Sequence, residues 1–439
     1  MKLIIYIPKS TPRIVYTFKH IFKYMLGIEY EICQDLQAFV SYNGPKFSYS
    51  QKPFQSGLHF HANPLLFEKG IGSPEITLSY YKKMPCIFMH RQNSEIPFDP
   101  FASTFFFLSR YEEYQVHIKD HHNRYKAKES FAFQNHILHL PVVDKWALLI
   151  EQILFEKFPY IVTKKREFRA INTLDIDQAY AIKEKSIFRI VGILGKSLIK
   201  FKFSDIKHIL KVIFGKEKDP YDTFDFIIEN IKNHPLIDHY FFLLLGEYSR
   251  FDKNTHPTNK NFQNLIKSLA DYAFVGIHPS YRSNSNKSVL ESEIKQLKHI
   301  LHREITSSRQ HFLKLELPKT YQTLAELGIT QDFTMGYAEN SGFRAGTCTP
   351  FHFYDLELEY ETPLKLFPFC IMEASLKYYQ HLTPKQAKKE INGMLEEVKR
   401  VKGTFIAIWH NESLSENELW KGWKEVYLYM LKKCQHAME

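Results

Sequence analysis

A change of pattern near residue 166 constrains the fold of this chain more than any other feature. From there onward, short apolar runs alternate with longer amphipathic segments. The runs that indicate strands are 168–177, 239–248, 273–281, 306–315 and 403–412, and the segments that indicate helices are 287–305 and 383–403. Parallel strands need a crossover connection, which is usually a helix. The alternation therefore predicts an α/β protein with a parallel sheet, either open or closed into a barrel.

Residues 1–165 have a different organisation, with short apolar runs separated by loops rich in Pro, Asn and Ser. The predicted strands and helices there are 2–7, 85–90, 99–115 and 140–158. Asp144 is the expected N-cap of the last helix, and the spacing of Arg110 and Glu113 predicts an ion pair on a helix surface. A chain of 439 residues is long for one domain. We expect an N-terminal α/β accessory domain of unknown role at 1–165 and a second domain at 166–439.

Composition limits the compartment and the partners. Five cysteines are an odd number without paired spacing, which argues against a disulfide framework. The apolar run at the N-terminus is too short for a signal peptide, and no long apolar run follows, so we expect no membrane span. No nucleic-acid motif accompanies the basic pI, and we expect no nucleic-acid partner. These features predict a cytoplasmic protein, and they leave its oligomeric state open.

The positive charge is concentrated between Lys183 and Lys218, where ten Lys and Arg residues stand against three Asp and Glu residues. Apolar and basic residues are interleaved there at helical spacing. One interpretation is a basic amphipathic surface for anionic lipid or an anionic glycan. The interpretation that we adopt is one or two helices whose apolar faces pack on the domain and whose lysines are solvated. We therefore expect surface helices that do not touch the functional site and that bind membranes weakly or not at all.

Titratable residues recur where the predicted strands of the second half end. Asp175 and Asp177 lie at the end of the first of these strands. Side chains at i and i+2 of a strand share a face, so both carboxylates should point to one place. The other residues of this kind are His278, Arg309, His311 and His410. In a parallel barrel all strands end on one face, which builds the active site. This set of side chains suits a divalent metal and acid–base chemistry.

The order of these motifs resembles that of the NodB-homology polysaccharide deacetylases, carbohydrate esterase family 4. The matching strings are "TLDID" (173–177), "HPSYR" (278–282), "RQHF" (309–312) and "IAIWH" (406–410). The whole chain also resembles the two-domain Bacteroidetes proteins called polysaccharide deacetylase family proteins. The resemblance implies that residues 166–439 form a distorted (β/α) barrel of seven or eight strands, of the glycoside hydrolase/deacetylase type.

The resemblance also implies a reaction, the metal-dependent hydrolysis of an N- or O-linked acetyl group on a carbohydrate, either a glycan or a glycan precursor. Asp175 aligns with the catalytic base of the family. Arg309 aligns with the arginine that holds this base, and His410 aligns with the general acid. Asp177, one place past the family's metal-binding Asp, and His278 correspond to metal ligands. The implied cofactor is a divalent metal, with zinc as the expected ion.

The chain departs from the family at the second metal-binding histidine. Arg282 stands at that position, and an arginine cannot bind a cation. His311, in the third motif, is the best replacement ligand. The alternative is that His311 only lines the groove, where the family has Pro or Tyr.

Aromatic residues near the motifs are candidates for contact with a sugar. The loop 336–357 is rich in aromatic side chains and contains Arg344 and Phe351. We expect these two residues, together with Tyr281 and Trp409 of the second and last motifs, to bind the substrate. The alternative is that the loop covers the barrel with an apolar plug.

Two other functions stay open. In a glycoside hydrolase, Asp175, Asp177 and Glu412 could supply an acid together with a base or nucleophile. Three strand-end histidines argue against this function, since a glycosidase does not need them. The second is a non-catalytic carbohydrate-binding relative. Metal content separates these functions, because a deacetylase of this kind holds about one divalent ion per chain and the other two need none.

Overall fold

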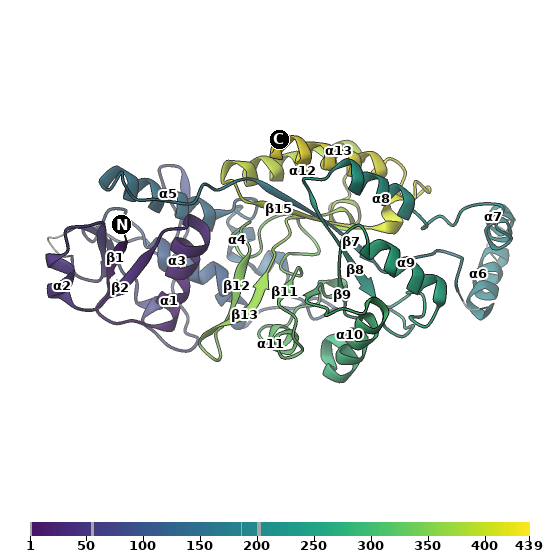
Figure 1. The fold of residues 1–439 in the computed structure, drawn as a ribbon, viewed down its shortest axis with the longest axis horizontal. Helices are drawn as coiled ribbons and strands as arrows, with labels where there is room; N and C mark the ends of the chain where they lie inside the picture. The colour runs from purple at the N-terminus through teal and green to yellow at the C-terminus, as the bar shows by residue number, and fades with distance from the viewer. Residues whose placement is uncertain (1, 54–56, 186, 200–202) are drawn as a thin grey trace.

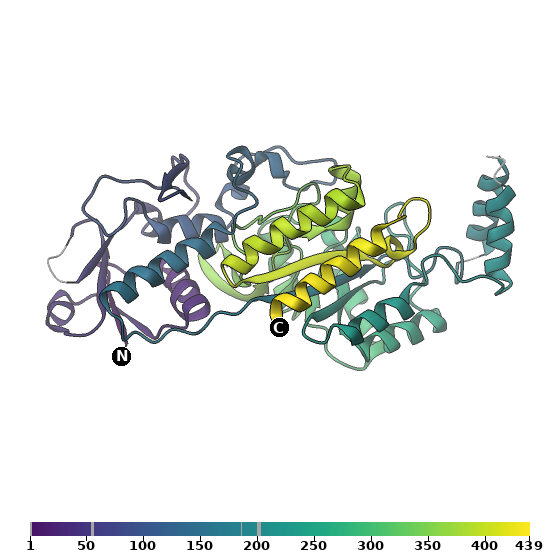
Figure 2. The same cartoon turned by 90° about the horizontal axis from the view of Figure 1, so that it is seen from above.

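The computed structural model describes residues 2–53, 57–185, 187–199 and 203–439 (Figures 1 and 2). Its strands form a four-stranded sheet, a nine-stranded sheet and a short antiparallel hairpin, β5 (Ser79–Tyr81) with β6 (Met84–Cys86). Both larger sheets are built mainly from parallel strands with helices in the connections. The chain is therefore a mixed α/β protein, as the alternation of strands and helices predicts.

The N-terminal sheet is entirely parallel and has the order β2-β1-β3-β4. Its strands are β1 (Leu3–Tyr6), β2 (Tyr30–Cys33), β3 (Lys46–Ser50) and β4 (Leu58–His61). The helices of this part are α1 (Pro12–Phe18), α2 (Leu36–Ser41), α3 (Pro100–Leu108), α4 (Phe131–Gln134) and α5 (Val142–Lys157), and a π-helical segment, Lys19–Leu26, continues α1. Asp99 caps α3 by accepting the N–H groups of the first turn, as its Asp-Pro start predicts.

Two local predictions in this part are wrong. Helix α5 begins at Val142, so Asp144 lies inside its first turn and not at its N-cap. The Asp144 carboxylate is fully buried and binds the side chains of Arg166 and Thr347 instead. The strand predicted at 85–90 is limited to β6, because Phe88 takes a left-handed backbone conformation (φ 56°) that turns the chain.

The second sheet has the order β12-β13-β11-β10-β9-β8-β7-β15-β14. Its strands are β7 (Arg169–Ile176), β8 (Asp238–Leu244), β9 (Phe274–His278), β10 (Ser307–Ser308), β11 (Gln331–Asp332), β12 (Phe351–Asp355), β13 (Tyr360–Leu366), β14 (Ile371–Met372) and β15 (Thr404–His410). All neighbouring pairs are parallel except β12 with β13. The short β11 and β14 have too few residues to give a periodic signal, and the sequence did not predict them.

The helices of this half are α8 (Phe224–Asn233), α9 (Lys260–Ala270), α10 (Lys287–Leu301), α11 (Lys319–Glu326), α12 (Pro384–Arg400) and α13 (Trp423–Met438). Figure 1 shows α8, α12 and α13 along one side of the strands and α9, α10 and α11 along the other. The parallel strands follow one another in chain order around the sheet, with one break between β13 and β14. No pairing joins these two strands among the described residues, so closure into a barrel stays a prediction.

The central strands are buried on both faces, which explains their near-continuous apolar sequences. Every residue of β8 after Asp238 is buried. Gly276 of β9 allows an especially close approach of the next strand, because a Cβ atom there would lie 2.6 Å from the carbonyl oxygen of Ser307. This tight packing fixes the strand that carries His278.

The two parts of the chain are in close contact. One hydrophobic cluster contains buried residues of both sheets. Glu113 accepts hydrogen bonds from Arg110 and from Arg344 of the second half, and all three side chains are buried. The Arg110–Glu113 pair predicted on a helix surface is therefore an interior contact between the two halves. The division into domains at residue 165 stays a prediction.

The basic segment forms two helices, α6 (Ile187–Ile199) and α7 (Phe203–Ile213). Figures 1 and 2 show that they project from the body and lie apart from both sheets. Residues 186 and 200–202 of this segment lie outside the described residues. No helix in the described part of the chain is both long and apolar enough to cross a membrane.

Candidate metal and acid–base site

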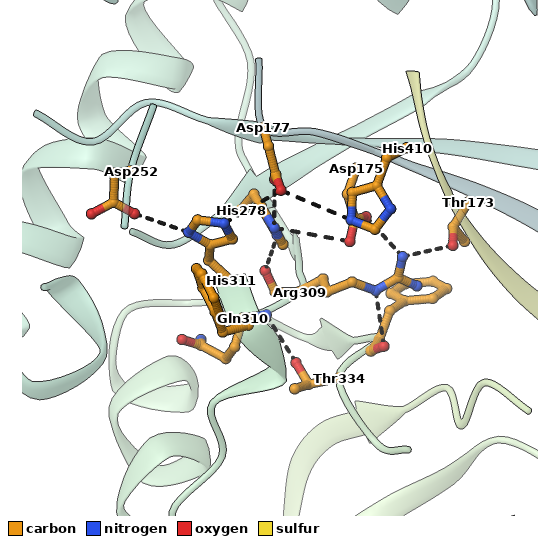
Figure 3. Close-up of polar contacts among 12 residues, drawn as sticks. Thr173, Asp175, Asp177, Asp252, His278, Arg309, Gln310, His311, Thr334 and His410 are labelled. Carbon is orange, nitrogen blue, oxygen red and sulfur yellow. Dashed lines mark hydrogen bonds and ion pairs between the residues drawn. The ribbon is translucent and has the colours of Figure 1, made fainter. Parts of the chain in front are cut away.

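The predicted strand-end residues meet at the carboxyl edge of the larger sheet (Figure 3). Strands β15, β7, β8, β9 and β10 are consecutive neighbours there. The six side chains of the site come from the ends of four of them: Asp175, Asp177, His278, Arg309, His311 and His410. Because parallel strands end on the same edge, residues that are far apart in the sequence lie side by side.

Asp177 lies between two histidines. Its Oδ1 is 3.1 Å from Nε2 of His278, and its Oδ2 is 3.3 Å from Nε2 of His311. One ligand atom from each of these three residues lies within 4.8 Å of the others. Oδ1 of Asp177 is buried and has no partner with hydrogen-bond geometry among the described residues. Donor atoms that crowd together in this way could share a single cation.

The other ring nitrogen of each histidine is occupied. Nδ1 of His278 donates to the carbonyl oxygen of Arg309 at 2.6 Å. Nδ1 of His311 donates to Oδ1 of Asp252 at 2.9 Å. A neutral imidazole that donates from Nδ1 presents a lone pair on Nε2, which is the atom that faces Asp177. The surroundings therefore orient both rings as metal ligands are usually oriented.

Burial and charge act in opposite directions on these groups. Burial lowers the pKa of His311, but Asp177 and Asp252 outweigh it and raise the pKa to about 9. Burial also raises the pKa of Asp177, yet His311 and His278 hold it well below the usual carboxyl value. The cluster is therefore a carboxylate surrounded by cationic or proton-donating groups.

Asp175 has different partners from Asp177. It is buried, and its Oδ1 accepts a hydrogen bond of 2.8 Å from Nη1 of Arg309. The Arg309 side chain is itself fully buried and also donates to Thr173 Oγ1 and to the carbonyl oxygen of Phe333. Burial lowers the pKa of this guanidinium, and Asp175 opposes the shift. This charge-assisted contact fixes the Asp175 carboxylate at the edge of the cluster.

His410 is oriented by Glu373, which is fully buried. Nδ1 of His410 lies 2.6 Å from Oε1 of Glu373, and the backbone N–H of His410 donates to the same oxygen. Nε2 lies 3.9 Å from Oδ2 of Asp177. Burial lowers the pKa of His410, but Glu373 and the two aspartates outweigh it, so the pKa is well above the ordinary value. His410 therefore tends to keep its proton at neutral pH.

A cavity of about 190 Å³ opens beside these residues. Asp175, Asp177, His278, His311 and His410 lie on its polar side. Its other walls include Arg124, Gln310, Phe312, Met372, Tyr378 and Tyr379. The backbone at Phe312 is left-handed (φ 59°), a strained conformation of the kind that clusters at functional sites.

Sequence reasoning missed four residues of this region. Asp252 and Glu373 position the histidines, but neither lies in a motif that the sequence displays. Arg124 comes from the N-terminal part, which was expected to be an accessory domain of unknown role, and donates to the carbonyl oxygen of Phe312. Tyr379 lies on a π-helical turn after β14, and such turns are frequent at functional sites. Of these four residues, only Tyr379 had a feature visible in the sequence, because it is next to another tyrosine, Tyr378.

The structure does not bring the four predicted substrate contacts to this cavity. Phe351 and Trp409 are fully buried, Phe351 beside His20 and Trp409 against α13. Arg344 is bound to Glu113 in the contact between the two halves. Tyr281 stacks on Phe251 outside the cavity wall.

Packing explains the positions of the two buried aromatic residues, Phe351 and Trp409. Residues 351–355 of the predicted 336–357 loop form strand β12, and its aromatic side chains, like Trp409 of β15, fill the interior. Arg282, at the place of the second histidine of the resembled family, is exposed near Glu247 and takes no part in the cluster.

Residues 3–159 match a family of unknown function, DUF7033. The curated proteins contain no match to this sequence.

Solved structures give distant matches. A protein from Mycobacterium smegmatis described as a polysaccharide deacetylase is 11% identical over 62% of this chain and 91% of its own, with a TM-score of 0.38. A CE4 family pseudoenzyme from Bacillus anthracis is 10% identical over 61% of this chain and 62% of its own, with a TM-score of 0.31. The allantoinase PuuE is 8% identical over 62% of this chain and 90% of its own, with a TM-score of 0.38.

Proposed function

We propose that this chain is a metal-dependent hydrolase that removes N- or O-linked acetyl groups from a carbohydrate. The observation that carries the proposal is the cluster of Asp177, His278 and His311, in which both imidazoles turn Nε2 towards the carboxylate. Two imidazole nitrogens and one carboxylate are a set of ligands found in catalytic zinc sites, which leave the fourth position open. Zinc is therefore the divalent ion that we expect.

The residues around this centre suit hydrolysis. A bound divalent ion would polarise the acetyl carbonyl group and lower the pKa of a water molecule. Asp175, held by Arg309, would accept the proton of the attacking water as general base. His410, kept protonated by Glu373, would donate a proton to the leaving amine or alcohol. Each proton transfer thus has a side chain that is already oriented for it.

The exposed tyrosines on the cavity rim are the side chains that we propose for sugar binding. Tyr378 and Tyr379 are both about half exposed and both line the cavity. Flat aromatic surfaces at the mouth of a polar cavity offer an apolar body together with a hydrogen-bonding tip. Tyr379→Ala should therefore raise KM for an oligosaccharide and leave the hydrolysis of a small acetate ester nearly unchanged.

Metal analysis together with acetyl release tests the proposal. The purified chain should bind about one zinc ion, and chelation should abolish acetate release from chitooligosaccharides and from nitrophenyl acetate. Asp177→Asn and His278→Ala should lower zinc occupancy, with activity partly restored by excess zinc. Asp175→Asn should keep zinc and lose about 10²- to 10⁴-fold in rate. His436→Ala, which removes an exposed histidine, serves as the control and should change neither quantity.

Other outcomes would support the two alternative functions. Glycosidic cleavage that persists under chelation and needs both Asp175 and Asp177 would point to a glycoside hydrolase. Sugar binding without turnover would point to a non-catalytic binding protein. Arg309 holds Asp175 and the histidines surround Asp177, an arrangement that favours the hydrolase with a metal ion over paired free carboxylates.

The architecture around the site is part of the same proposal. We propose that residues 166–439 are a distorted barrel open between β13 and β14, and that residues 1–165 are an accessory domain. Arg124 in the cavity wall gives this domain a place beside the substrate. We also propose that the protein is cytoplasmic.

A further inference from the structure

Helices α6 (Ile187–Ile199) and α7 (Phe203–Ile213), together called the α6–α7 hairpin, expose apolar side chains to solvent. The expectation was that the apolar faces of these helices pack on the body of the protein. The two helices pack mainly on each other instead. Figures 1 and 2 show them projecting from the end of the molecule. An apolar surface that remains exposed on a projecting element indicates a binding surface.

The exposed side chains follow helical spacing. In α6 they are Val191, Leu198 and Ile199, which are separated by seven and eight residues. In and just after α7 they are Leu210, Ile213 and Phe214, separated by three and four residues. Residues at these spacings lie on one face of a helix. Ile199 is 79% exposed and Phe214 is 72% exposed, so these stripes are accessible to a partner.

The inner face of α7 is buried in the ordinary way. Ile209 and Val212 pack against Ile182, which precedes the hairpin. Leu210 directly follows Ile209 and Ile213 directly follows Val212, and both are exposed. The helix therefore has a satisfied inner face and a second, unpartnered apolar face.

The hairpin is attached to the body by a defined neck. The Asp219 carboxylate, which is buried, accepts the backbone N–H groups of Ala181, Ile182, Lys183 and Tyr221. The Asn411 side chain donates to the carbonyl oxygens on both sides of the neck, those of Gln178 and Tyr221. These bonds join the start and the end of the insertion, so its projection from the carboxyl end of β7 is built into the fold.

The positive charge of the hairpin favours an anionic partner. Between Lys183 and Lys218 there are ten Lys and Arg residues and three Asp and Glu residues, a surplus of positive charge. Lys207 and Lys216 are exposed on or next to α7, near the apolar stripe. Short helices with an apolar face and flanking lysines bind the surface of anionic bilayers, where the apolar residues enter the headgroup region and the lysines pair with the lipid charges.

We propose that the α6–α7 hairpin docks on an anionic lipid bilayer and holds the protein at its surface. The helices have 13 and 11 residues, shorter than the roughly 20 that span a bilayer, so they would lie in the interface. This proposal is independent of the proposed enzyme activity, since it uses no residue of the metal cluster.

Vesicle flotation of the full-length protein tests this proposal. The protein should float with vesicles of equimolar phosphatidylcholine and phosphatidylglycerol and not with phosphatidylcholine alone, and added salt should weaken the binding. Ile213→Asp with Phe214→Asp should lower the partition coefficient by at least about tenfold. Lys207→Gln and Lys216→Gln should each lower it by about fivefold. Val116→Asp, at a fully exposed valine in another loop, is the matched control and should have no effect.

Three results would overturn the proposal. The first is a wild-type chain that does not float with the mixed vesicles. The second is binding that the lysine variants weaken but the Ile213/Phe214 double variant does not, which would indicate a polyanion such as an acidic glycan. The third is a wild-type dimer in light scattering that the double variant makes monomeric, without vesicle binding by either, which would assign the surface to a second copy. Circular dichroism and thermal unfolding show that each variant is folded.

Discussion

Removing the charge of Asp252 should weaken metal binding without changing the ligands themselves. Asp252 lies behind His311 and receives its Nδ1–H at 2.9 Å. The same Oδ1 atom also accepts the backbone N–H of Tyr281, and Oδ2 accepts the hydroxyl of Ser249. An asparagine can keep the contacts to His311 and Tyr281, with its carbonyl oxygen at the Oδ1 position. Its amide group cannot accept the Ser249 hydroxyl, whose oxygen already accepts the backbone N–H groups of Phe251 and residue 252. Asp252→Asn therefore removes a charge and one hydroxyl hydrogen bond and keeps the contact to His311.

The size of the effect follows from what Asp252 does to the ring. A carboxylate behind a histidine fixes the tautomer that presents Nε2 and increases its basicity. Removing such a partner typically costs 10- to 100-fold in metal affinity, which is about 1.4 to 2.7 kcal/mol. We expect Asp252→Asn near the lower limit, because the hydrogen bond survives. Asp252→Ala should approach the upper limit, because it also releases the ring.

Zinc titration against a competing chromophoric chelator measures this difference directly. Asp332→Asn is the matched control, since Asp332 is a fully buried carboxylate of the same sheet that binds Ser308 and Thr334 and touches no histidine of the cluster. It should leave zinc affinity unchanged. Affinities for the wild type, Asp252→Asn and Asp252→Ala that agree within twofold would refute the reasoning, because His311 would then not be a ligand oriented by Asp252.

Three further changes test other parts of the structure. Glu373→Gln should lower the pKa of His410 in NMR titrations of the metal-free protein, because the carboxylate outweighs the effect of burial; an unchanged pKa would contradict the assigned contact. Glu113→Gln should cost about 3–5 kcal/mol in urea unfolding at pH 7, since it leaves the buried guanidinium of Arg344 without its anion, whereas Arg110 keeps Glu112. Burial raises the pKa of Glu113 but the two arginines lower it to about 2, so wild-type stability should fall as the pH drops from about 4.5 towards 2, and the variant should lack this slope. Gly276→Ala should destabilise the protein by about 1–3 kcal/mol, because the added Cβ would meet the backbone of Ser307. Gly393→Ala, in open space on α12, should stabilise it slightly. Equal melting temperatures for these two variants would contradict the tight packing at β9.

The sequence predicted the long central strands well and the short ones poorly. Strands β7, β8, β9 and β15 have five to eight residues with continuous burial, which produces a clear apolar run. Strands β11 and β14 have two residues each, and no local pattern predicts them because their positions depend on pairing with neighbours that are distant in the sequence. The run 306–315 did predict a strand, but only Ser307–Ser308 of it form one, β10. The longer β12 and β13, at the edge of the sheet, were not predicted.

The same distinction applies to the site. Residues at the ends of long strands were found because the strands themselves were visible, and the structure brings these residues together. Asp252 and Glu373 act through the histidines they orient, and they lie in segments without a motif. Phe351 and Trp409, two of the expected substrate contacts, lie in the core, because the sequence does not show whether an aromatic side chain faces a cavity or the interior. Burial of Trp409 is decided by α13, which packs against it.

The two carboxylates of "TLDID" are equivalent in the sequence, and only their contacts in the folded protein make them different. Spacing by one residue on a strand places Asp175 and Asp177 towards the same edge of the sheet, where two free negative charges would repel each other. Asp175 is still within β7, where the buried guanidinium of Arg309 neutralises it. Asp177 lies one residue past the strand and meets histidines on both of its oxygens. One carboxylate thus has a permanent cation supplied by the protein, and the other lies between two histidines that, in the proposed metal site, would bind the ion once they lose a proton. For this reason the two Asp→Asn changes should differ in their effect on zinc content although they are chemically identical.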